Sequence, residues 1–340
     1  MTMSTGKSSS NRSFAAAAVL VAVGLLCAGC AHRRPVTPEW ILEDLQGPRV
    51  KEVVIDSDTY NEMDDQYAIA YAVASDRMKV LALHAAPFHN DRSQSFEEGM
   101  ELSFKEMVRV LSIIGRSDEI PVFEGARKSV SEDPEGFDPD NPASRDLVRI
   151  AREARKPVYV LTLGALTNVA AALTLDPSIK DRIVVVWLGT NCFSRGHLKE
   201  FNLLQDYAAG QMVVDSGVPL VILPAMGEPG EGTQVLRVGP EDLKAIEGEG
   251  RPQAFFRSEL PAEFHDTTGA WSHILWDVAA PGLIAHPENY RLRVIPAPIL
   301  ADDRTFAFDS TRHRIVWMDS LDRDAVCADL FRCISSIDCE

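Results

Sequence analysis

The sequence predicts an α/β protein built on a doubly wound, mostly parallel sheet with helices on both faces. Short apolar runs rich in β-branched residues recur from residue 51 onward without polar alternation, which is typical of parallel strands buried on both faces. Helix-like stretches separate these runs, and repeated strand–helix alternation favours a doubly wound sheet. The length of 340 residues, with 46% hydrophobic and 25% charged residues, suits a globular protein, and no internal repeat divides it.

The expected elements alternate along the chain. The strands are the apolar runs Val53–Asp56, Val80–Ala85, Val158–Leu163, Ile183–Leu188 and Val218–Leu223. The helices are expected at Met63–Ala74, Phe96–Ile114, Ser144–Ala154, Leu166–Leu175 and Gln205–Asp215. A further strand at His313–Met318 and a helix at Asp322–Ser335 complete the pattern. The acidic, proline-containing residues 129–143 predict a surface loop, and the Gly-, Pro- and Glu-rich residues 226–268 predict a small helical insertion or a lid.

The N-terminus is expected to lie outside the fold. Basic residues precede an apolar run of 13 residues, Phe14–Leu26, and small residues follow it, as in a secretory signal peptide. The run is shorter than the ~20 residues of a spanning helix, which argues against a transmembrane anchor. Leu26 to Cys30 resembles the bacterial lipobox, which predicts lipidation of Cys30, export and, because Ala31 follows, an outer-membrane location facing the periplasm. We therefore expect a signal peptide at 1–29, a tether at 30–48 and one domain at 49–340.

Charge and cysteine content limit the classes of partner. A net charge of −16 and a pI near 5.0 argue against nucleic-acid binding through a basic face. A small molecule is the expected partner, and the lipid anchor is the only expected membrane contact. Cys327, Cys333 and Cys339 crowd the C-terminus, where export would permit one disulfide; a metal site there is the weaker alternative because no His lies beside them.

Acidic residues cluster directly after the first predicted strand. Five carboxylates, those of Asp56, Asp58, Glu62, Asp64 and Asp65, lie within ten residues. So much negative charge at one strand end repels itself unless a cation neutralises it. No His or Cys lies within the cluster, so the ligands are oxygen atoms, which favour Ca²⁺ or Mg²⁺ over Zn²⁺. Because ligands of doubly wound sheets bind beyond the carboxyl ends of strands, the cluster predicts a metal-dependent catalytic site.

The cluster and several later motifs together resemble the inosine–uridine-preferring nucleoside hydrolase family. Asp56-Ser57-Asp58 followed by Asp64-Asp65 is similar to the opening motif of that family, with a spacer, 59–63, two residues longer than usual, as in a bacterial subgroup. The later motifs follow in the family's order: Leu163-Gly164-Ala165-Leu166-Thr167-Asn168, Val186-Trp187-Leu188-Gly189, Glu200-Phe201-Asn202 and Trp276-Asp277. The resemblance implies the nucleoside hydrolase fold, cleavage of ribonucleosides into ribose and free base, and it allows a homo-oligomer.

The resemblance also implies roles for individual residues. Ca²⁺ would be held by Asp58, Asp65, Asp277 and the backbone carbonyl of Leu163. The ribose hydroxyls would be held by Asp64, Asn90, Glu200 and Asn202. Asp58 would also be the general base for an attacking water that the metal makes easier to deprotonate. The ring of carboxylates would stabilise an oxocarbenium-like sugar. Asp56 and Glu62 are expected to be structural, and Asn168 is expected to cap or stabilise the start of its helix.

Trp276 departs from the pattern of many relatives, in which a His at this place helps to protonate the leaving base. A Trp side chain cannot usefully supply that proton, but it can stack on a purine ring. We therefore expect a preference for purine nucleosides. The competing interpretation is that Trp276 packs in the core. His84, His89, His197 and His273 are candidate acids, and the sequence favours none of them.

Two other functions compete with nucleoside hydrolysis. A lipoprotein that binds nucleosides or other ribosyl compounds without cleaving them fits the missing His at position 276, although the intact carboxylates argue that the metal site is retained. A haloacid-dehalogenase-like phosphatase also carries two Asp residues after its first strand. That pattern expects Thr or Val where Tyr60 stands, and it leaves Glu200-Phe201-Asn202 unexplained.

Overall fold

The computed structural model describes residues 1–3, 6, 35–264 and 271–338. The chain divides into two units, residues 1–34 and residues 35–340. Cys30 and nearly all of the predicted signal peptide lie outside the described residues, so both stay predictions. Among the helices that the structure does describe, none combines the length and apolar character needed to cross a bilayer.

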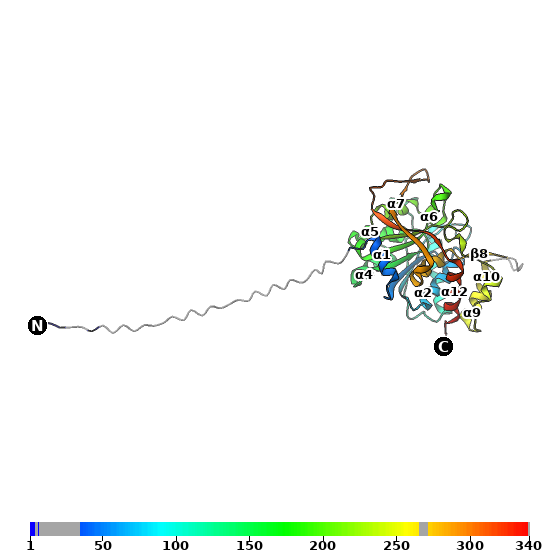
Figure 1. Cartoon of the computed structure of the whole chain (residues 1–340), viewed down its shortest axis with the longest axis horizontal. Helices are drawn as coiled ribbons and strands as arrows, with labels where there is room; N and C mark the ends of the chain where they lie inside the picture. Colours follow the sequence, from blue (N-terminus) through cyan, green and yellow to red (C-terminus); the bar gives the residue numbers. More distant parts are fainter. Residues whose placement is uncertain (4–5, 7–34, 265–270, 339–340) are drawn as a thin grey trace. The chain divides into compact units, whose positions relative to one another are not determined.

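An eight-stranded sheet forms the centre of the second unit (Figure 1). Its strand order is β3-β2-β1-β4-β5-β6-β12-β9, and every neighbouring pair is parallel except β12 with β9. The strands are β1 (Lys51–Ser57), β2 (Met78–Ala85), β3 (Val122–Glu124), β4 (Val158–Thr162), β5 (Ile183–Leu188), β6 (Leu220–Leu223), β9 (Tyr290–Pro296) and β12 (Arg314–Leu321). Each of the six predicted strands is present, so the predicted fold class is confirmed.

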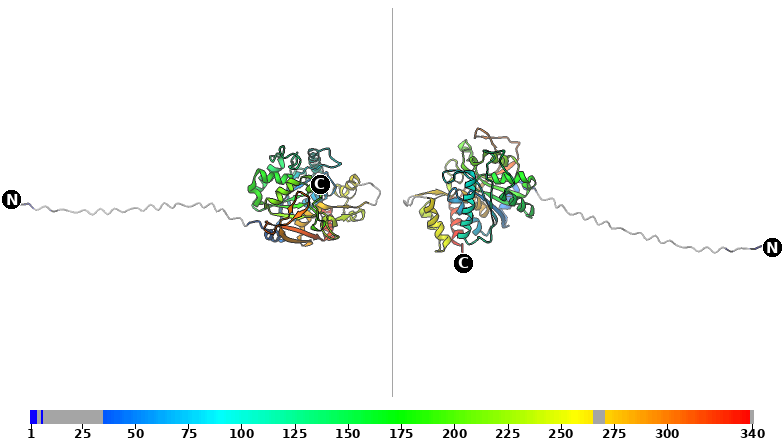
Figure 2. Two further views of the ribbon diagram at one scale, coloured as in Figure 1. Left: turned by 90° about the horizontal axis from the view of Figure 1, so that it is seen from above. Right: turned by 180° about the vertical axis from the view of Figure 1, so that it is seen from behind.

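Helices cover both faces of the sheet (Figures 1 and 2). They are α1 (Pro38–Gln46), α2 (Asp64–Ala74), α3 (Phe96–Ile113), α4 (Pro142–Glu153), α5 (Thr167–Leu175), α6 (Phe201–Gln205), α7 (Tyr207–Asp215), α11 (Ala279–Ala285) and α12 (Arg323–Ser335). One core layer contains side chains of α1, α2, α3, α11 and α12, and the other contains those of α4, α5 and α7. Val184 and Val186 of β5 join the first layer, whereas Val185 and Trp187 join the second. Burial of each such side chain contributes roughly 1.5–3 kcal/mol.

The direction of the chain across the sheet reverses at β1. From β1 the chain runs through β2 to the edge strand β3 and then returns to β4 on the other side of β1. Parallel sheets bind ligands at such a switch point, beyond the carboxyl ends of the two strands. Asp58 follows β1 and Leu163 follows β4, and the Leu163 N–H donates to the Asp56 carbonyl over 2.7 Å. The topology therefore brings two parts of the predicted site together.

Shorter elements fill the connections. Residues 226–264 contain η3 (Thr233–Val235), β7 (Arg237–Val238), α8 (Pro240–Leu243), α9 (Arg251–Ala254), η4 (Phe255–Glu259) and α10 (Leu260–Phe264). This is the small helical insertion that the composition predicts. β8 (His273–Ile274) pairs antiparallel with β7 and leads into η5 (Trp276–Val278). The other short elements are η1 (Pro177–Arg182), η2 (Phe193–Arg195), η6 (Pro287–Asn289) and the hairpin β10 (Ile299–Leu300) with β11 (Phe306–Ala307).

Two boundaries differ from the expectations. Residues 38–46, assigned to the tether, form α1, because Thr37 caps the helix and Ile41 and Leu45 bury their side chains in the first core layer. The helix expected at 205–215 begins two residues later, as α7, and a separate short helix, α6, ends at Gln205. The backbone of Asp206 leaves helical geometry (φ −150°), and its carboxylate caps α7. Both differences depend on contacts with distant parts of the chain.

The described cysteines form no disulfide. Cys192, Cys327 and Cys333 are buried free thiols. Cys327 and Cys333 stand six residues apart on α12, which separates them by about 9 Å along the helix axis. A disulfide requires Cα atoms within about 7 Å of each other, so this pair cannot close. Cys339 lies outside the described residues.

Candidate active site

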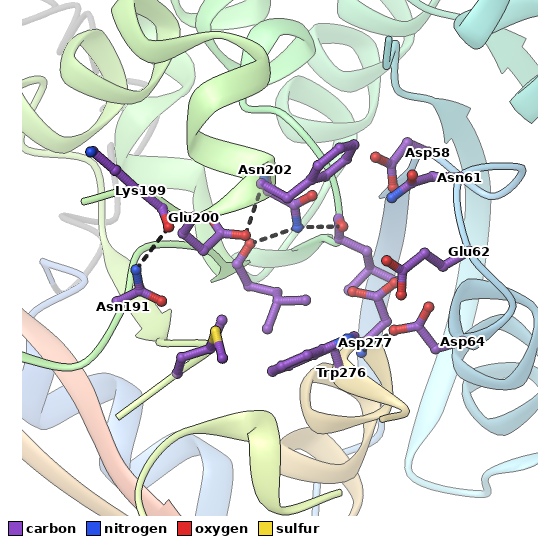
Figure 3. A pocket seen from close by; sticks show the side chains of 15 residues that line it. Asp58, Asn61, Glu62, Asp64, Asn191, Lys199, Glu200, Asn202, Trp276 and Asp277 are labelled. Atoms are coloured by element: carbon purple, nitrogen blue, oxygen red, sulfur yellow. Dashed lines mark hydrogen bonds between the residues drawn. The ribbon is translucent and has the colours of Figure 1, made fainter. Parts of the chain in front are cut away.

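A cavity of about 170 Å³ lies at the carboxyl ends of the central strands (Figure 3). One side is acidic and the other contains amide, apolar and aromatic groups. The lining residues are Asp58, Asn61, Glu62, Asp64, Leu163, Leu188, Asn191, Lys199, Glu200, Phe201, Asn202, Ala225, Met226, Trp276 and Asp277. The cavity therefore contains Asp58, Asp64, Leu163, Glu200, Asn202, Trp276 and Asp277 of the predicted set. Asp65 and Asn90 do not line it.

Four buried aspartates form the acidic side of the site. Asp58, Asp64, Asp65 and Asp277 are each at most 3% exposed. Asp64 and Asp65 begin α2, and the Asp277 N–H donates to Asp64 Oδ2 over 3.1 Å, which joins η5 to that helix. Carboxylate oxygens of Asp64, Asp65 and Asp277 lie within 4.8 Å of one another. The closest trio thus includes Asp64, which the resemblance assigns to the sugar.

Burial raises the pKa of each of these carboxyl groups. Desolvation is the largest cause, and repulsion between neighbouring carboxylates adds to it for Asp58, Asp64 and Asp277, whose pKa values lie well above the ordinary range. The pKa of Asp65 rises to about 7, although the Ser57 hydroxyl donates to its carboxylate over 2.5 Å and lowers it. A bound cation would favour the charged form of all four groups.

The donor set fits a hard divalent cation such as Ca²⁺. Asp58 Oδ2 and Asp277 Oδ1 are buried and lack a hydrogen-bond partner on the described protein. The Leu163 carbonyl accepts one hydrogen bond from the Asn202 side chain, over 2.8 Å, and keeps a second lone pair. All of these atoms are oxygens, which Ca²⁺ prefers. Gly164 allows the backbone after Leu163 to lie close to Asp58, because a Cβ atom at Gly164 would lie 3.1 Å from the Asp58 carboxyl carbon.

Glu200 and Asn202 hold the loop between β5 and α6 against the ends of the strands. The Glu200 carboxylate caps α6, accepting from the N–H groups of Asn202 and Leu203, and it also accepts from the Thr190 N–H over 3.1 Å. The Asn202 amide nitrogen donates to the carbonyls of Leu163 and Leu188. Burial raises the pKa of Glu200 to about 7, and its backbone hydrogen bonds oppose that shift. Both side chains reach the cavity while holding the loop in place.

Asn90 contacts the cavity only through another residue, Asn61. The Asn90 amide nitrogen donates to Asn61 Oδ1 over 2.6 Å, and Asn61 lines the cavity beside Asp58 (Figure 3). Arg92 holds the same segment, because its Nε donates to the Tyr60 carbonyl over 3.0 Å and its guanidinium lies over the Tyr60 ring. The long spacer 59–63 thus places an amide where the resemblance suggests Asn90.

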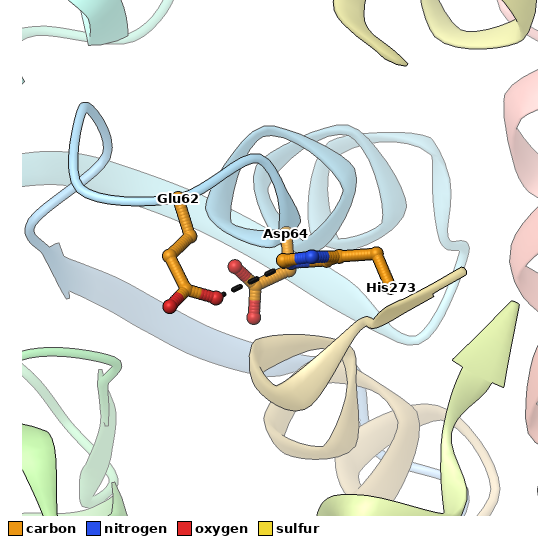
Figure 4. Close-up of side chains that lie close together, drawn as sticks. All are labelled: Glu62, Asp64 and His273. Atoms are coloured by element: carbon orange, nitrogen blue, oxygen red, sulfur yellow. Dashed lines mark ion pairs between the residues drawn. The ribbon is translucent and has the colours of Figure 1, made fainter. Parts of the chain in front are cut away.

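Glu62 also enters the site from the long spacer. Its carboxylate lies 3.2 Å from His273 Nε2, next to Asp64 (Figure 4). Its charge raises the pKa of Asp58 and Asp64. Burial lowers the pKa of His273, but Glu62 and Asp64 reverse that effect and the net shift is upward. Glu62 is therefore part of the electrostatics of the site, beyond the structural role expected for it.

Trp276 lines the cavity next to Asp277 and is half-buried. The same side chain also packs against the first core layer, so the two competing interpretations of Trp276 both describe part of its surroundings. None of the described lining residues is a histidine. His84, one of the four candidate acids, instead pairs with Asp146 inside the protein, with Nε2 3.0 Å from Oδ2.

Asp56 and Asn168 support the site from inside the sheet. The Asn168 amide nitrogen donates to Asp56 Oδ1 and to the Ala85 carbonyl, and its oxygen accepts from the Ala126 N–H. We expected Asn168 to cap or stabilise the start of its helix, but Leu166 occupies the cap position. The Asn168 amide instead joins the ends of neighbouring strands. Burial raises the pKa of Asp56 to about 6. Asp56 therefore has the structural surroundings expected of it.

Six further residues line the cavity without having been predicted as site residues: Asn61, Asn191, Lys199, Phe201, Ala225 and Met226. Asn61 and Glu62 could have been suspected because they lie between two aspartate motifs. Asn191 follows β5 at the same edge of the sheet as Asp58. No pattern in the sequence distinguishes Ala225 or Met226, which reach the site only through the arrangement of β6 and the loop after it.

This arrangement, a doubly wound sheet with buried carboxylates at its switch point, is the fold and site of a candidate metal-dependent hydrolase. The sequence profile described as "Inosine-uridine preferring nucleoside hydrolase" matches residues 53–326, and the chain belongs to this family. The match leaves the phosphatase alternative without support.

Curated relatives include the pyrimidine-specific ribonucleoside hydrolases RihA of Klebsiella pneumoniae (strain 342) and Escherichia coli O7:K1, which are 27% and 26% identical to the chain over 220 residues. These alignments cover 58% of the chain and 66% of each relative, slightly under two thirds. Similar solved structures include a purine-preferring ribonucleoside hydrolase from Gardnerella vaginalis (18% identity, TM-score 0.64) and an inosine-guanosine nucleoside hydrolase (17%, 0.65). The two structural alignments include 84% and 85% of this chain, respectively, and 99% of the length of each relative.

Proposed function

We propose that the protein is a ribonucleoside hydrolase that cleaves the N-glycosidic bond to release ribose and a free base. The observation that carries this proposal is the group of four buried aspartates, two of them with unpartnered oxygens, at one side of the cavity. Buried carboxylates without compensating charge are costly, so a cationic ligand or transition state must be part of their function. Family membership supports the same activity.

Each residue has a proposed task in that reaction. Asp58, Asp65, Asp277 and the Leu163 carbonyl would hold Ca²⁺, which would supply an oriented water of lowered pKa. The buried Asp58 carboxylate would also accept the proton that this water loses. The water oxygen forms the new bond to the anomeric carbon while the bond to the base breaks.

The sugar is held by a second set of residues. We propose that Asp64, Glu200 and Asn202 bind ribose hydroxyls, with Asn90 acting through Asn61. Asp64 keeps its place because the Asp277 N–H donates to it, and Glu200 keeps its place through three backbone N–H groups. The negative potential of the aspartates stabilises the positive charge that develops on the sugar ring.

We propose that the enzyme favours purine nucleosides. Trp276 presents its ring at the cavity wall, where stacking on the larger purine surface yields the greater contact area. The relatives differ in the base that they prefer. The two RihA relatives are described as pyrimidine-specific, whereas the Gardnerella vaginalis enzyme is described as purine-preferring. The long spacer at 59–63 places this chain, in our proposal, in the bacterial subgroup that shares it.

We also propose that the protein is exported and held at the outer membrane by a lipid on Cys30, with residues 1–29 removed as a signal peptide. Because α1 begins at Pro38, the tether would be the short segment that follows Cys30. The basis is the sequence pattern at 26–30. Metabolic labelling with a fatty-acid probe, compared between the wild type and Cys30→Ala, tests it; equal labelling would contradict it.

The activity is tested by measuring reducing-sugar release from a panel of purine and pyrimidine nucleosides, with Ca²⁺ or with a chelator. We expect sugar release that the chelator abolishes and that Asp58→Ala lowers by orders of magnitude. Calorimetric titration with Ca²⁺ then separates a metal-competent but inactive protein from one that binds no metal. Absence of sugar release from every nucleoside would refute the proposed hydrolysis and favour a nucleoside-binding role.

A further inference from the structure

We propose that Asn191 is a specificity-determining residue whose side-chain oxygen accepts a hydrogen bond from a neutral O–H or N–H donor of the substrate. In Figure 3 Asn191 lies across the cavity from Asp58 and Asp64. The inference rests on the proposed nucleoside hydrolase function and deepens it, because it states the hydrogen-bonding character that a substrate must have on this side of the cavity.

The first observation is an acceptor that the protein leaves unused. Asn191 is 1% exposed and lines the cavity, and its Oδ1 has no hydrogen-bond partner among the described residues. Buried polar atoms in native proteins are nearly always paired, so an unpaired one at a cavity wall indicates a ligand or water. The matching partner must be a donor, because a carbonyl oxygen can only accept.

The second observation concerns the orientation of the amide. Asn191 Nδ2 donates to the carbonyl of Lys199 over 3.1 Å and, less closely, to that of His197 over 3.4 Å. Reversing the amide would set Oδ1 against these two carbonyl oxygens, which cannot donate. Only one orientation is therefore compatible with the loop, and it turns the oxygen toward the cavity (Figure 3).

The third observation is backbone strain at the preceding residue. Thr190 has φ +67°, in the left-handed region that β-branched residues rarely adopt. The strained conformation is held from two sides, because the Thr190 N–H donates to Glu200 and its carbonyl accepts from the Ala225 N–H over 2.9 Å. Strain of this kind persists where surrounding contacts enforce it and concentrates at ligand sites. Here it directs the chain after β5 so that Asn191 faces the cavity.

These observations define the ligand chemistry. Because Nδ2 is used by the loop, Asn191 offers the substrate an acceptor and no donor. A phosphate monoester brings acceptor oxygens and negative charge, and it would meet both Asn191 Oδ1 and the buried Glu200 carboxylate. A nucleoside can supply the donor from its 5′-hydroxyl or from an N–H of its base. The substrate class is therefore a nucleoside with a free donor at this position, and nucleoside 5′-monophosphates are disfavoured.

The test compares inosine with 5′-deoxyinosine, 1-methylinosine and inosine 5′-monophosphate, using the Ca²⁺-loaded protein. Calorimetry measures the affinity of each compound for the wild type and for Asn191→Leu, which keeps similar size but removes the acceptor. Arg195→Ala is the matched control, because Arg195 is exposed in the same loop and does not line the cavity. Thermal unfolding confirms that each variant is folded, and sugar release is measured in the same samples.

We expect one of the two donor-deficient analogues to bind the wild type about tenfold more weakly than inosine. A loss with 5′-deoxyinosine identifies the sugar hydroxyl as the donor, and a loss with 1-methylinosine identifies the base. Asn191→Leu should weaken inosine binding by a similar factor and abolish the difference, while Arg195→Ala retains it. Equal affinity of the wild type for inosine and both analogues, or tighter binding of the monophosphate, would overturn the inference.

The two proposals fail in different ways. Discrimination in binding without ribose release would refute the hydrolase function and leave the role of Asn191 intact. Ribose release without discrimination would do the reverse. If Asn191→Leu does not fold, the comparison of inosine with its two analogues on the wild type still decides, because it requires no variant.

Discussion

Replacing Asp65 by Asn should make the metal-free protein more stable at neutral and alkaline pH while removing its response to Ca²⁺. Asp65 is 1% exposed, and its pKa in the folded protein is about 7 instead of 3.8. The folded state therefore holds more protons than the unfolded state between these two pH values, and stability falls as the pH rises through that window. The change of about 3 pKa units corresponds to a cost of about 4 kcal/mol above pH 7.

Asp65→Asn removes that cost, because an amide does not ionise and its oxygen can still accept from the Ser57 hydroxyl. Without metal, at pH 8, we expect the variant to unfold about 6 °C above the wild type, because a domain of about 300 residues shifts by roughly 1.5 °C per kcal/mol. The gain should shrink as the pH falls and vanish below about pH 4, where Asp65 is protonated in both states.

Calcium should reduce this difference. At a hundredfold excess over its dissociation constant, Ca²⁺ stabilises the wild type by about 2.7 kcal/mol, and it should have little effect on the variant. Differential scanning calorimetry from pH 4 to pH 8, with Ca²⁺ or with a chelator, measures both effects. Glu52→Gln is the control, since it removes only an exposed pair with Lys79 and should change little. The reasoning is refuted if Asp65→Asn is no more stable than the wild type at pH 8 without metal, or if it retains the full response to Ca²⁺.

Three further predictions concern binding of the substrate and of Ca²⁺. Asn90→Ala should weaken nucleoside binding about fivefold, and it should add nothing to Asn61→Ala, because Asn90 acts through the Asn61 amide; additive losses in this double-mutant cycle would show that Asn90 acts independently. Trp276→Ala should lower the affinity for inosine about tenfold or more and that for uridine less, as loss of base stacking predicts, and an equal loss for both would argue against a purine preference. Glu62→Gln should weaken Ca²⁺ binding in calorimetry, because it removes a negative charge that acts on Asp58 and Asp64, whereas an unchanged affinity would return Glu62 to a purely structural role.

The predictable parts of the site are those carried by short local patterns at strand ends. Asp58, Asp64 and Asp65 follow one buried strand within a few residues, and Leu163 follows another, so any parallel sheet that places these strands side by side also brings their ends together. The spacing alone could not distinguish the task of each carboxylate. Asp64 lies in the tightest trio with Asp65 and Asp277, and Asp277 comes from a segment more than 200 residues later in the chain.

The less predictable parts depend on loops whose conformations follow from distant contacts. Asn61 reaches the cavity because Asn90 and Arg92 hold the spacer, and Glu62 meets His273 from β8. Neither contact leaves a periodic pattern in the sequence. The same is true of α1, whose two buried apolar residues are too few to signal a helix until the core that receives them is known.

Local patterns were sufficient to predict the alternation of strands and helices, the acidic cluster after the first strand and the family to which the ordered motifs point, because hydrophobic periodicity and short motifs are local properties of the chain. Which side chains face one cavity depends instead on tertiary packing. Asn191 is the clearest case: its oxygen is directed by a strained Thr190 that Glu200 and Ala225 hold in place. Such a conformation is unfavourable locally and exists only because packed segments from elsewhere in the chain enforce it.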